Sequence, residues 1–182
     1  SDSTFSFIAS LMYQQLFEIL YRQADERDDN RLPIHTRFIL DEFANIARIP
    51  DFEKKIATMR SREISVSIIL QNLAQLKNEY KDSWETIFGN CDTTLFLGGK
   101  EPSTTKYLSE LIGNETVDYM SISETRGRDR SWSRSNQLIQ RPLFEAAEIS
   151  RLKNSEALVH IRGFNIFKDK KYPLENHPNI DL

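Results

Sequence analysis

Two adjacent carboxylates follow an apolar run in the first third of the chain. The run Phe38–Leu40 is typical of a buried strand, and Asp41 and Glu42 come directly after it. In an open α/β sheet both side chains would project at the carboxyl edge, where ligands of such sheets bind. An aspartate there can hold Mg²⁺ through the ion's water shell, and the glutamate can act as general base on an attacking water. The plainer interpretation is a strand end closed by two solvated acids.

An amide side chain follows the next predicted strand. The segment Ser65–Gln71 is apolar enough to form a second buried strand that ends at Gln71. If the two strands are neighbours, this amide lies beside Asp41 and Glu42, within reach of a γ-phosphate and its attacking water. Alternatively, Gln71 or Asn72 satisfies backbone donors at the start of the following helix.

Two arginines, Arg60 and Arg62, lie on the connection between these strands. An arginine that reaches into a neighbouring subunit's site can stabilise the charge spread over a transferring phosphoryl group. Cations at a helix end also complement the helix dipole, so two solvated arginines are the alternative.

A basic stretch with one aromatic lies further along the chain. Its residues are Arg126, Arg128, Arg130, Trp132 and Arg134. Arginines beside an aromatic suit a nucleic-acid backbone and one stacked base. The stretch lacks periodicity, so we predict a mobile loop over 123–142, and a merely solvated loop is the alternative.

Strand and helix patterns alternate around these residues. Helical spacing predicts helices at 4–22, 51–61, 73–80, 84–88, 102–112 and 143–152, and the apolar side chains of 4–22 are expected to form one buried stripe. A third strand is expected at 92–98, and a β-hairpin at 156–172. This order predicts an α/β fold, a three-layer parallel sheet with helices on both faces, plus a C-terminal β-hairpin.

Composition is that of an ordinary soluble globular protein. The 182 residues are 39% hydrophobic and 28% charged, and the net charge of −3 argues against a protein coated in basic patches for duplex DNA. A single cysteine, Cys91, excludes an internal disulfide and a four-thiolate zinc site. We expect one domain over 1–182, excised from a longer protein because the chain begins at Ser1 rather than Met.

The phosphate-cradling motif G-x-x-x-x-G-K-[ST] does not occur in the sequence. The chain therefore cannot by itself be a complete P-loop ATPase.

The segment FILDEFANIARIPDFEKKIATMRSR, residues 38–62, resembles the Walker B region of type IV coupling proteins, the TraG/TraD-like DNA-pumping ATPases of bacterial conjugation. The resemblance continues through 65–80, 89–101 and 157–178. It implies a RecA-like nucleotide-binding domain interrupted by an all-helical insertion. This chain would be the part after that insertion, the Walker B half of the P-loop NTPase domain, without the Walker A half.

The resemblance also implies a role for each candidate residue. Asp41 is the Mg²⁺-coordinating Walker B aspartate, Glu42 activates water, and Gln71 is the polar sensor on the adjacent strand. Arg60, with Arg62 as the near alternative, acts in trans across a hexamer interface. ATP and Mg²⁺ are the implied cofactors of the full-length ATPase, and the fragment alone is expected to be inactive because it lacks the P-loop.

The implied partners are single-stranded DNA, a relaxase and type IV secretion channel subunits. The implied assembly is a homo-hexamer, anchored at the cytoplasmic face of the bacterial inner or plasma membrane and driving DNA translocation. Two alternatives stay open: a non-catalytic module that docks DNA or relaxase, and a related pump for duplex DNA.

Overall fold

The computed structural model describes residues 2–125 and 131–179, with side chains over 5–120 and 135–179. Contacts divide the chain into two compact units, unit 1 over Ser1–Thr94 and unit 2 over Leu95–Leu182. The expectation of one domain over 1–182 stays a prediction.

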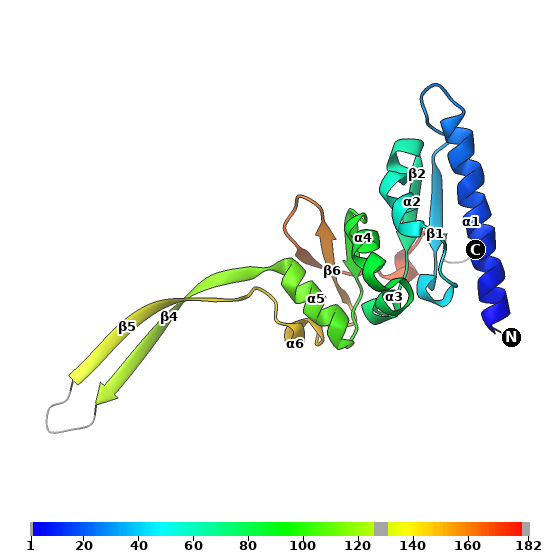
Figure 1. Ribbon diagram of the computed structural model, residues 1–182. Coiled ribbons are helices and arrows are strands. Elements are labelled where there is room, and N and C mark those ends of the chain that lie inside the picture. Colours follow the sequence, from blue (N-terminus) through cyan, green and yellow to red (C-terminus); the bar gives the residue numbers. More distant parts are fainter. Residues whose placement is uncertain (1, 126–130, 180–182) are drawn as a thin grey trace. The chain divides into compact units, whose positions relative to one another are not determined.

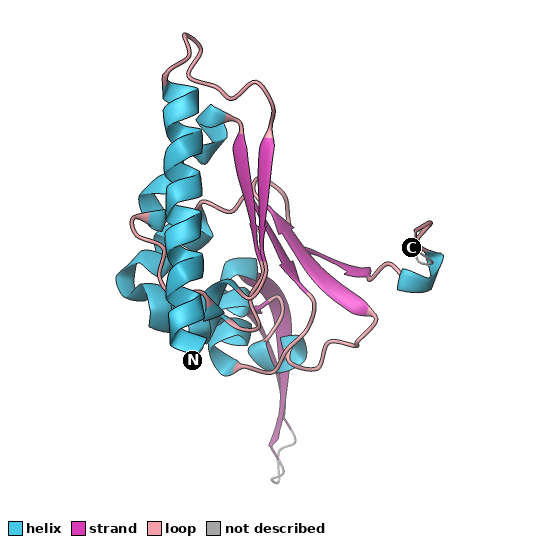
Figure 2. Cartoon of the chain, turned by 90° about the vertical axis from the view of Figure 1, so that its right-hand side faces the viewer, coloured by secondary structure: helices cyan, strands magenta, loops and turns pink. Residues whose placement is uncertain are grey.

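Unit 1 contains a two-stranded parallel sheet (Figure 1). Its elements are α1 (Asp2–Asp25), β1 (Thr36–Leu40), η1 (Phe43–Asn45), α2 (Phe52–Thr58), η2 (Met59–Arg62), β2 (Ile64–Ile68), α3 (Leu73–Tyr80), η3 (Lys81–Ser83) and α4 (Trp84–Gly89). Strands β1 and β2 pair in parallel from Thr36↔Ile64 to Leu40↔Ile68, as the sequence predicted for these two strands. Figure 2 shows α1 running alongside them.

Aromatic side chains form the core of unit 1. The ring of Phe17 on α1 lies 4.5 Å from that of Phe38 on β1, and 5.9 Å from that of Phe52 on α2. Phe43 lies 4.9 Å from Phe52 and stacks on Tyr80 of α3 at 5.3 Å. One aromatic cluster therefore joins α1, β1, α2 and α3 into a single packed body.

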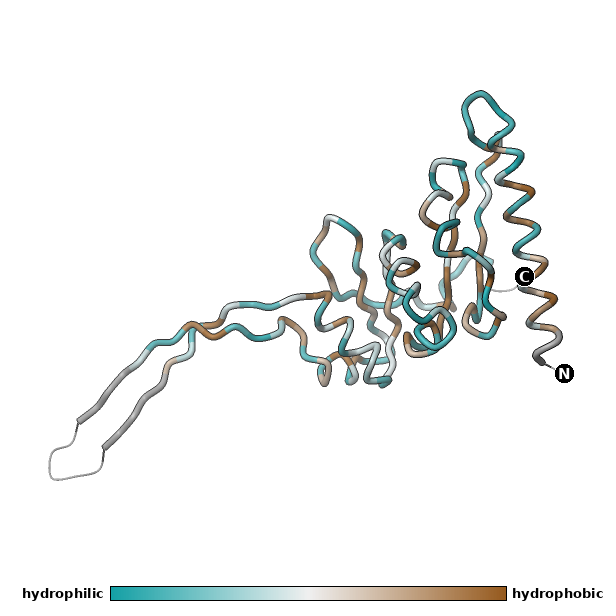
Figure 3. The backbone as a smooth tube through the Cα atoms, viewed as in Figure 1, coloured by the Kyte–Doolittle hydropathy of each residue, from teal (hydrophilic) through white to brown (hydrophobic). Residues whose placement is uncertain are grey.

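Two predictions about burial in unit 1 are wrong. The stripe expected to be buried on α1 is largely exposed, with Phe5 72% and Met12 52% exposed, and the packed side instead carries Ser10, Phe17 and Ala24. Hydrophobic residues recur along the length of α1 (Figure 3). The strand β1 is covered on one face only, because Phe38 and Leu40 are buried while Ile39 is 65% exposed. A hydroxyl group ties α1 to the segment between η1 and α2, because Ser10 donates to the Arg48 carbonyl oxygen at 2.8 Å.

Unit 2 packs a helix pair against a second sheet. Its elements are α5 (Pro102–Ile112), β4 (Asn114–Thr125), β5 (Ser131–Pro142), α6 (Ala146–Ile149), β6 (Glu156–Ile161), β7 (Phe167–Lys170) and η4 (Leu174–Asn176). The strand order is β3-β6-β7, where β3 is Thr93–Phe96, and Leu108, Ile149 and Leu158 form the core. The predicted C-terminal hairpin is confirmed, since β6 and β7 pair antiparallel.

A long antiparallel hairpin replaces much of the loop predicted over 123–142. Strands β4 and β5 pair from Asn114↔Pro142 to Thr125↔Ser131. Backbone pairing along the ladder does not require the apolar periodicity on which the prediction relied, and the described hairpin side chains are mostly exposed. The prediction of a loop is therefore wrong for 131–142.

The α/β class is confirmed, but the described residues do not form one three-layer parallel sheet. Their sheets are small: a parallel pair, a three-stranded sheet that contains the antiparallel pair β6–β7, and the antiparallel β4–β5 hairpin. Among the described helices, none is long and apolar enough to cross a membrane.

Candidate functional site

The carboxyl ends of β1 and β2 meet at one edge. Beyond the last ladder pair, the Ile69 amide donates to the Leu40 carbonyl oxygen at 2.9 Å, and the Phe43 amide donates to that of Ile69 at 3.1 Å. These bonds hold the two chain segments together as they leave the sheet. Asp41 and Glu42 on one segment, and Gln71 on the other, therefore follow the same sheet edge.

The two carboxylates are exposed, although the residues on either side of them are buried. Leu40 and Phe43 are fully buried, whereas Asp41 and Glu42 between them are exposed. Glu42 has a φ of 49°, a left-handed conformation that is costly for a residue with a Cβ. The anchored neighbours hold this strained turn, which is the kind of backbone outlier that clusters at functional sites.

Hydrogen bonds from nearby residues orient both carboxylates. Asp41 Oδ1 accepts from the Glu42 amide at 2.9 Å, and Glu42 Oε2 accepts from Asn45 Nδ2 at 2.9 Å. Asn45 was not singled out from the sequence, although its position three residues after Glu42 could have suggested the contact. Such an exposed carboxylate pair can hold a hydrated cation and accept a proton from a nearby water.

Two amide residues, Gln71 and Asn72, follow β2, and the sequence left open which of them caps the next helix. Asn72 Oδ1 accepts from the Gln75 amide at 3.0 Å and so caps α3. Gln71 is exposed, and its Oε1 lies at 3.5 Å from Gln75 Nε2, a long contact. Since Asn72 supplies the cap, the Gln71 side chain is not needed for it.

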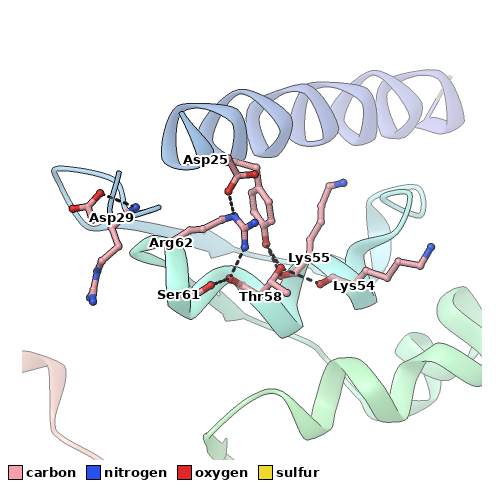
Figure 4. Close-up of polar contacts among 9 residues, drawn as sticks. Asp25, Asp29, Lys54, Lys55, Thr58, Ser61 and Arg62 are labelled. Carbon is pink, nitrogen blue, oxygen red and sulfur yellow. Dashed lines mark hydrogen bonds and ion pairs between the residues drawn. The ribbon is translucent and has the colours of Figure 1, made fainter. Parts of the chain in front are cut away.

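The two arginines of η2 have different surroundings. Arg62 Nε donates to Asp25 Oδ1 at 2.9 Å, its Nη1 donates to the Thr58 carbonyl oxygen at 3.4 Å, and its guanidinium lies 4.6 Å from the Tyr21 ring centroid (Figure 4). Arg60 is exposed, and within the described side chains nothing forms a hydrogen bond or ion pair with its guanidinium. Sequence reasoning missed Asp25 and Tyr21, which lie 37 and 41 positions before Arg62 and carry no local signal.

The basic stretch is only partly covered by the structure. Arg126, Arg128 and Arg130 lie outside the described residues, while Trp132 and Arg134 lie on β5, with their side chains outside the described part. Their assignment to DNA stays a prediction.

Within residues 2–125 and 131–179, no group of three or more His, Cys, Asp or Glu side chains could hold a metal ion. One exposed carboxylate can order part of a hydrated Mg²⁺ shell, and this role of Asp41 stays a prediction.

A family model described as "TraM recognition site of TraD and TraG" matches residues 35–154. The chain belongs to this family. The match includes the strand ends of β1 and β2 and both arginines of η2, so the resemblance drawn from the sequence is confirmed.

Relatives of the TraD and TraG family support this membership. The conjugal transfer protein TraG of Rhizobium radiobacter is 30% identical over 131 residues, which cover 70% of this chain and 20% of that protein. Protein VirD4 of Agrobacterium fabrum (strain C58 / ATCC 33970) is 27% identical over 164 residues, covering 88% of this chain and 24% of that protein. The chain thus spans about a fifth to a quarter of these curated relatives.

Solved structures share the fold. The unbound monoclinic form of the bacterial conjugative coupling protein TrwBdeltaN70 has a TM-score of 0.66 at 19% identity, over 90% of this chain and 38% of that one. The plasmid coupling protein TrwB in complex with ADP and Mg²⁺ has a TM-score of 0.63 at 19% identity, over 90% and 37%.

Proposed function

We propose that the chain is the Walker B half of a conjugative coupling ATPase, which uses ATP hydrolysis to drive single-stranded DNA with its relaxase to a type IV secretion channel. The observation that carries the proposal is the meeting of Asp41, Glu42 and Gln71 at the carboxyl edge of paired parallel strands. That edge is where open α/β sheets bind ligands.

Each side chain at the edge has a task that suits its surroundings. Asp41 orders the water shell of Mg²⁺, Glu42 accepts the proton of the attacking water, and Gln71 contacts the water and the terminal phosphate. The solved complexes of TrwB with ADP and Mg²⁺ and with an ATP analogue support a nucleotide site in this fold.

The bare faces of unit 1 support a partial domain. A parallel sheet is normally covered on both faces, yet Ile39 on β1 and Ile69 beyond β2 are 65% and 46% exposed. We infer that the remaining part of a RecA-like three-layer domain, including the phosphate-cradling loop, covers them in a longer protein. The chain alone is then inactive and binds nucleotide weakly.

Assembly and partners follow from the same proposal. Arg60, the exposed arginine of η2, acts on the nucleotide of a neighbouring copy in a homo-hexamer. The ring lies at the cytoplasmic face of the membrane, and the arginines of 126–134 contact DNA. The description of the family as a recognition site for TraM supports a further contact with the relaxosome.

The test is ATP hydrolysis by the full-length protein and its Glu42→Gln variant, with and without single-stranded DNA. We expect nucleotide binding to persist while turnover falls about 100-fold or more, because the general base is lost. Glu110→Gln, at an exposed position of α5, is the matched control and should keep the parental rate. A near-parental rate for Glu42→Gln would show that Glu42 has no such role.

A docking module without catalysis is the second candidate, favoured by the recognition function in the family's description. If the basic stretch holds DNA, affinity for single-stranded DNA should fall steeply with salt, because phosphate contacts release counterions. Absence of binding at low salt would remove the DNA version of this candidate. Preference for duplex over single-stranded DNA as the stimulant of hydrolysis would instead favour a duplex-DNA pump.

A further inference from the structure

Two sets of contacts hold the turn η2 on the residues that follow Arg60. The first set centres on Arg62, whose side chain is 23% exposed and bonds Asp25 at the end of α1 (Figure 4). The guanidinium also lies over the Tyr21 ring, a favourable arrangement for a cation. Tyr21 in turn donates to the Lys55 carbonyl oxygen at 2.5 Å, and its hydroxyl lies 3.1 Å from Thr58 Oγ1. Helix α1 is thereby tied to both α2 and η2.

The second set centres on Glu63, the residue after η2. Its carboxylate pairs with Arg31 and with His35 Nδ1, and the His35 Nε2 atom lies 2.9 Å from Ser65 Oγ. Glu63 has a φ of 61°, so the chain turns sharply into β2. The backbone is fixed as well, since the Leu32 amide donates to the Arg62 carbonyl oxygen at 3.2 Å.

Arg60 lies within this fixed turn but has a different environment. Its side chain is exposed, whereas Met59 beside it is 2% exposed and anchors the turn in the core. The backbone of η2 is held on both sides of Arg60, so this exposed arginine is pre-organised. Pre-organisation matters because a small misplacement of a charge-stabilising group costs a large part of its effect.

We propose that Arg62 is a positioning residue which, with Asp25 and Tyr21, fixes η2 so that Arg60 reaches the nucleotide of a neighbouring copy. This inference rests on the proposed function, in which Arg60 acts in trans. Arg62 itself does not touch the nucleotide, and its planar fork suits a carboxylate and a carbonyl oxygen at once.

The test is subunit complementation in the full-length protein. Three variants are prepared alone and as co-assembled pairs: Glu42→Gln, which keeps the arginine face, Arg60→Ala, which keeps its own site, and Arg62→Gln. ATP turnover and nucleotide affinity are measured for each. We expect Arg62→Gln alone to lose between about 10- and 100-fold in turnover with nucleotide affinity unchanged.

The pairs separate a positioning role from a structural one. Glu42→Gln should regain turnover with Arg60→Ala and also with Arg62→Gln, because one copy supplies an intact arginine face to the other's intact site. Arg60→Ala with Arg62→Gln should regain none, since both lack that face. Two outcomes would overturn the inference. One is recovered turnover in the pair of Arg60→Ala with Arg62→Gln. The other is that Glu42→Gln recovers turnover with Arg60→Ala but not with Arg62→Gln. Failure of Glu42→Gln with Arg60→Ala overturns the trans role in the proposed function itself.

A gentler variant guards against misfolding. Asp25→Asn alters a half-exposed carboxylate on α1, outside η2, and should fall in the same complementation class as Arg62→Gln with a smaller loss. Arg27→Gln is the matched control: Arg27 lies just beyond α1, is exposed and pairs with Asp29 at 3.4 Å. It should keep the parental turnover, and a loss as large as that of Asp25→Asn would overturn the specific assignment to Arg62 and Asp25.

Discussion

Unit 1 and the β4–β5 hairpin use similar apolar residues in opposite ways. In unit 1, Phe43 and Phe52 are fully buried and Tyr80 is 1% exposed. On the hairpin, Tyr119 is 54% exposed and Leu138 74%. The first arrangement creates a stiff frame, whereas an isolated two-stranded ribbon is only marginally stable by itself.

The difference explains why the proposed chemistry belongs to unit 1 and not to the hairpin. Asp41 and Glu42 are flanked by fully buried residues, so the backbone of the strand end cannot move without disturbing the core. The hairpin instead presents a long backbone ladder with exposed side chains, an arrangement suited to contact with a partner surface rather than to holding reacting atoms.

The largest expected effect is the loss of an aromatic ring from the unit 1 core. Phe52→Ala should lower the free energy of unfolding by about 3–5 kcal/mol, because Phe52 contacts Phe17, Phe43 and Tyr80. Tyr119→Ala on the hairpin should change stability by less than about 0.5 kcal/mol. Amide hydrogen exchange of β1 and β2, and of β4 and β5, in the full-length protein measures both. Equal losses of protection in Phe52→Ala and Tyr119→Ala would contradict the contrast between the packed core of unit 1 and the exposed hairpin.

A smaller effect is expected from one hydroxyl in the same core. The buried Ile49 amide donates to the Tyr80 hydroxyl at 3.2 Å, so Tyr80→Phe leaves that amide without its acceptor and should lower stability by about 1–3 kcal/mol. Burial raises the pKa of Tyr80 above its ordinary value of 10.0. The stability this gives is complete below pH 10 and is lost as pH rises towards the folded pKa, because the unfolded tyrosine ionises first. The difference in stability between the parent and Tyr80→Phe should therefore become smaller above pH 10, as measured by hydrogen exchange of β1 and β2. A difference that is constant with pH would contradict this expectation.

The smallest effect should come from an exposed ion pair on the hairpin. Arg141 pairs with Glu115 at 2.7 Å, but its side chain is 59% exposed. Arg141→Gln should leave hydrogen exchange of β4 and β5 unchanged, because exposed pairs are screened by water and salt. Arg62→Gln in unit 1 is the matched comparison, since the Arg62 side chain pairs with a carboxylate and makes two further protein contacts, to the Thr58 carbonyl oxygen and the Tyr21 ring. Strong loss of hairpin protection in Arg141→Gln would reverse the comparison.

Local patterns were sufficient for much of the fold and of the candidate site. The helix at 73–80 and the C-terminal hairpin lie where periodicity and turn residues predicted them. The carboxylates and the amide at the strand ends were also visible, since a polar residue directly after an apolar run needs no knowledge of distant contacts.

The sequence by itself determined the family, the strand ends with their carboxylates, and the arginines on the connection between the strands. Only the tertiary structure decided which side of α1 packs, that 131–142 pairs as a strand, and that Asp25 and Tyr21 hold Arg62 while Arg60 stays exposed. The physical reason is range: helices and strand ends follow from neighbouring residues. Burial of one helix face and pairing of one side chain depend on residues more than thirty positions away, such as Asp25 and Arg62.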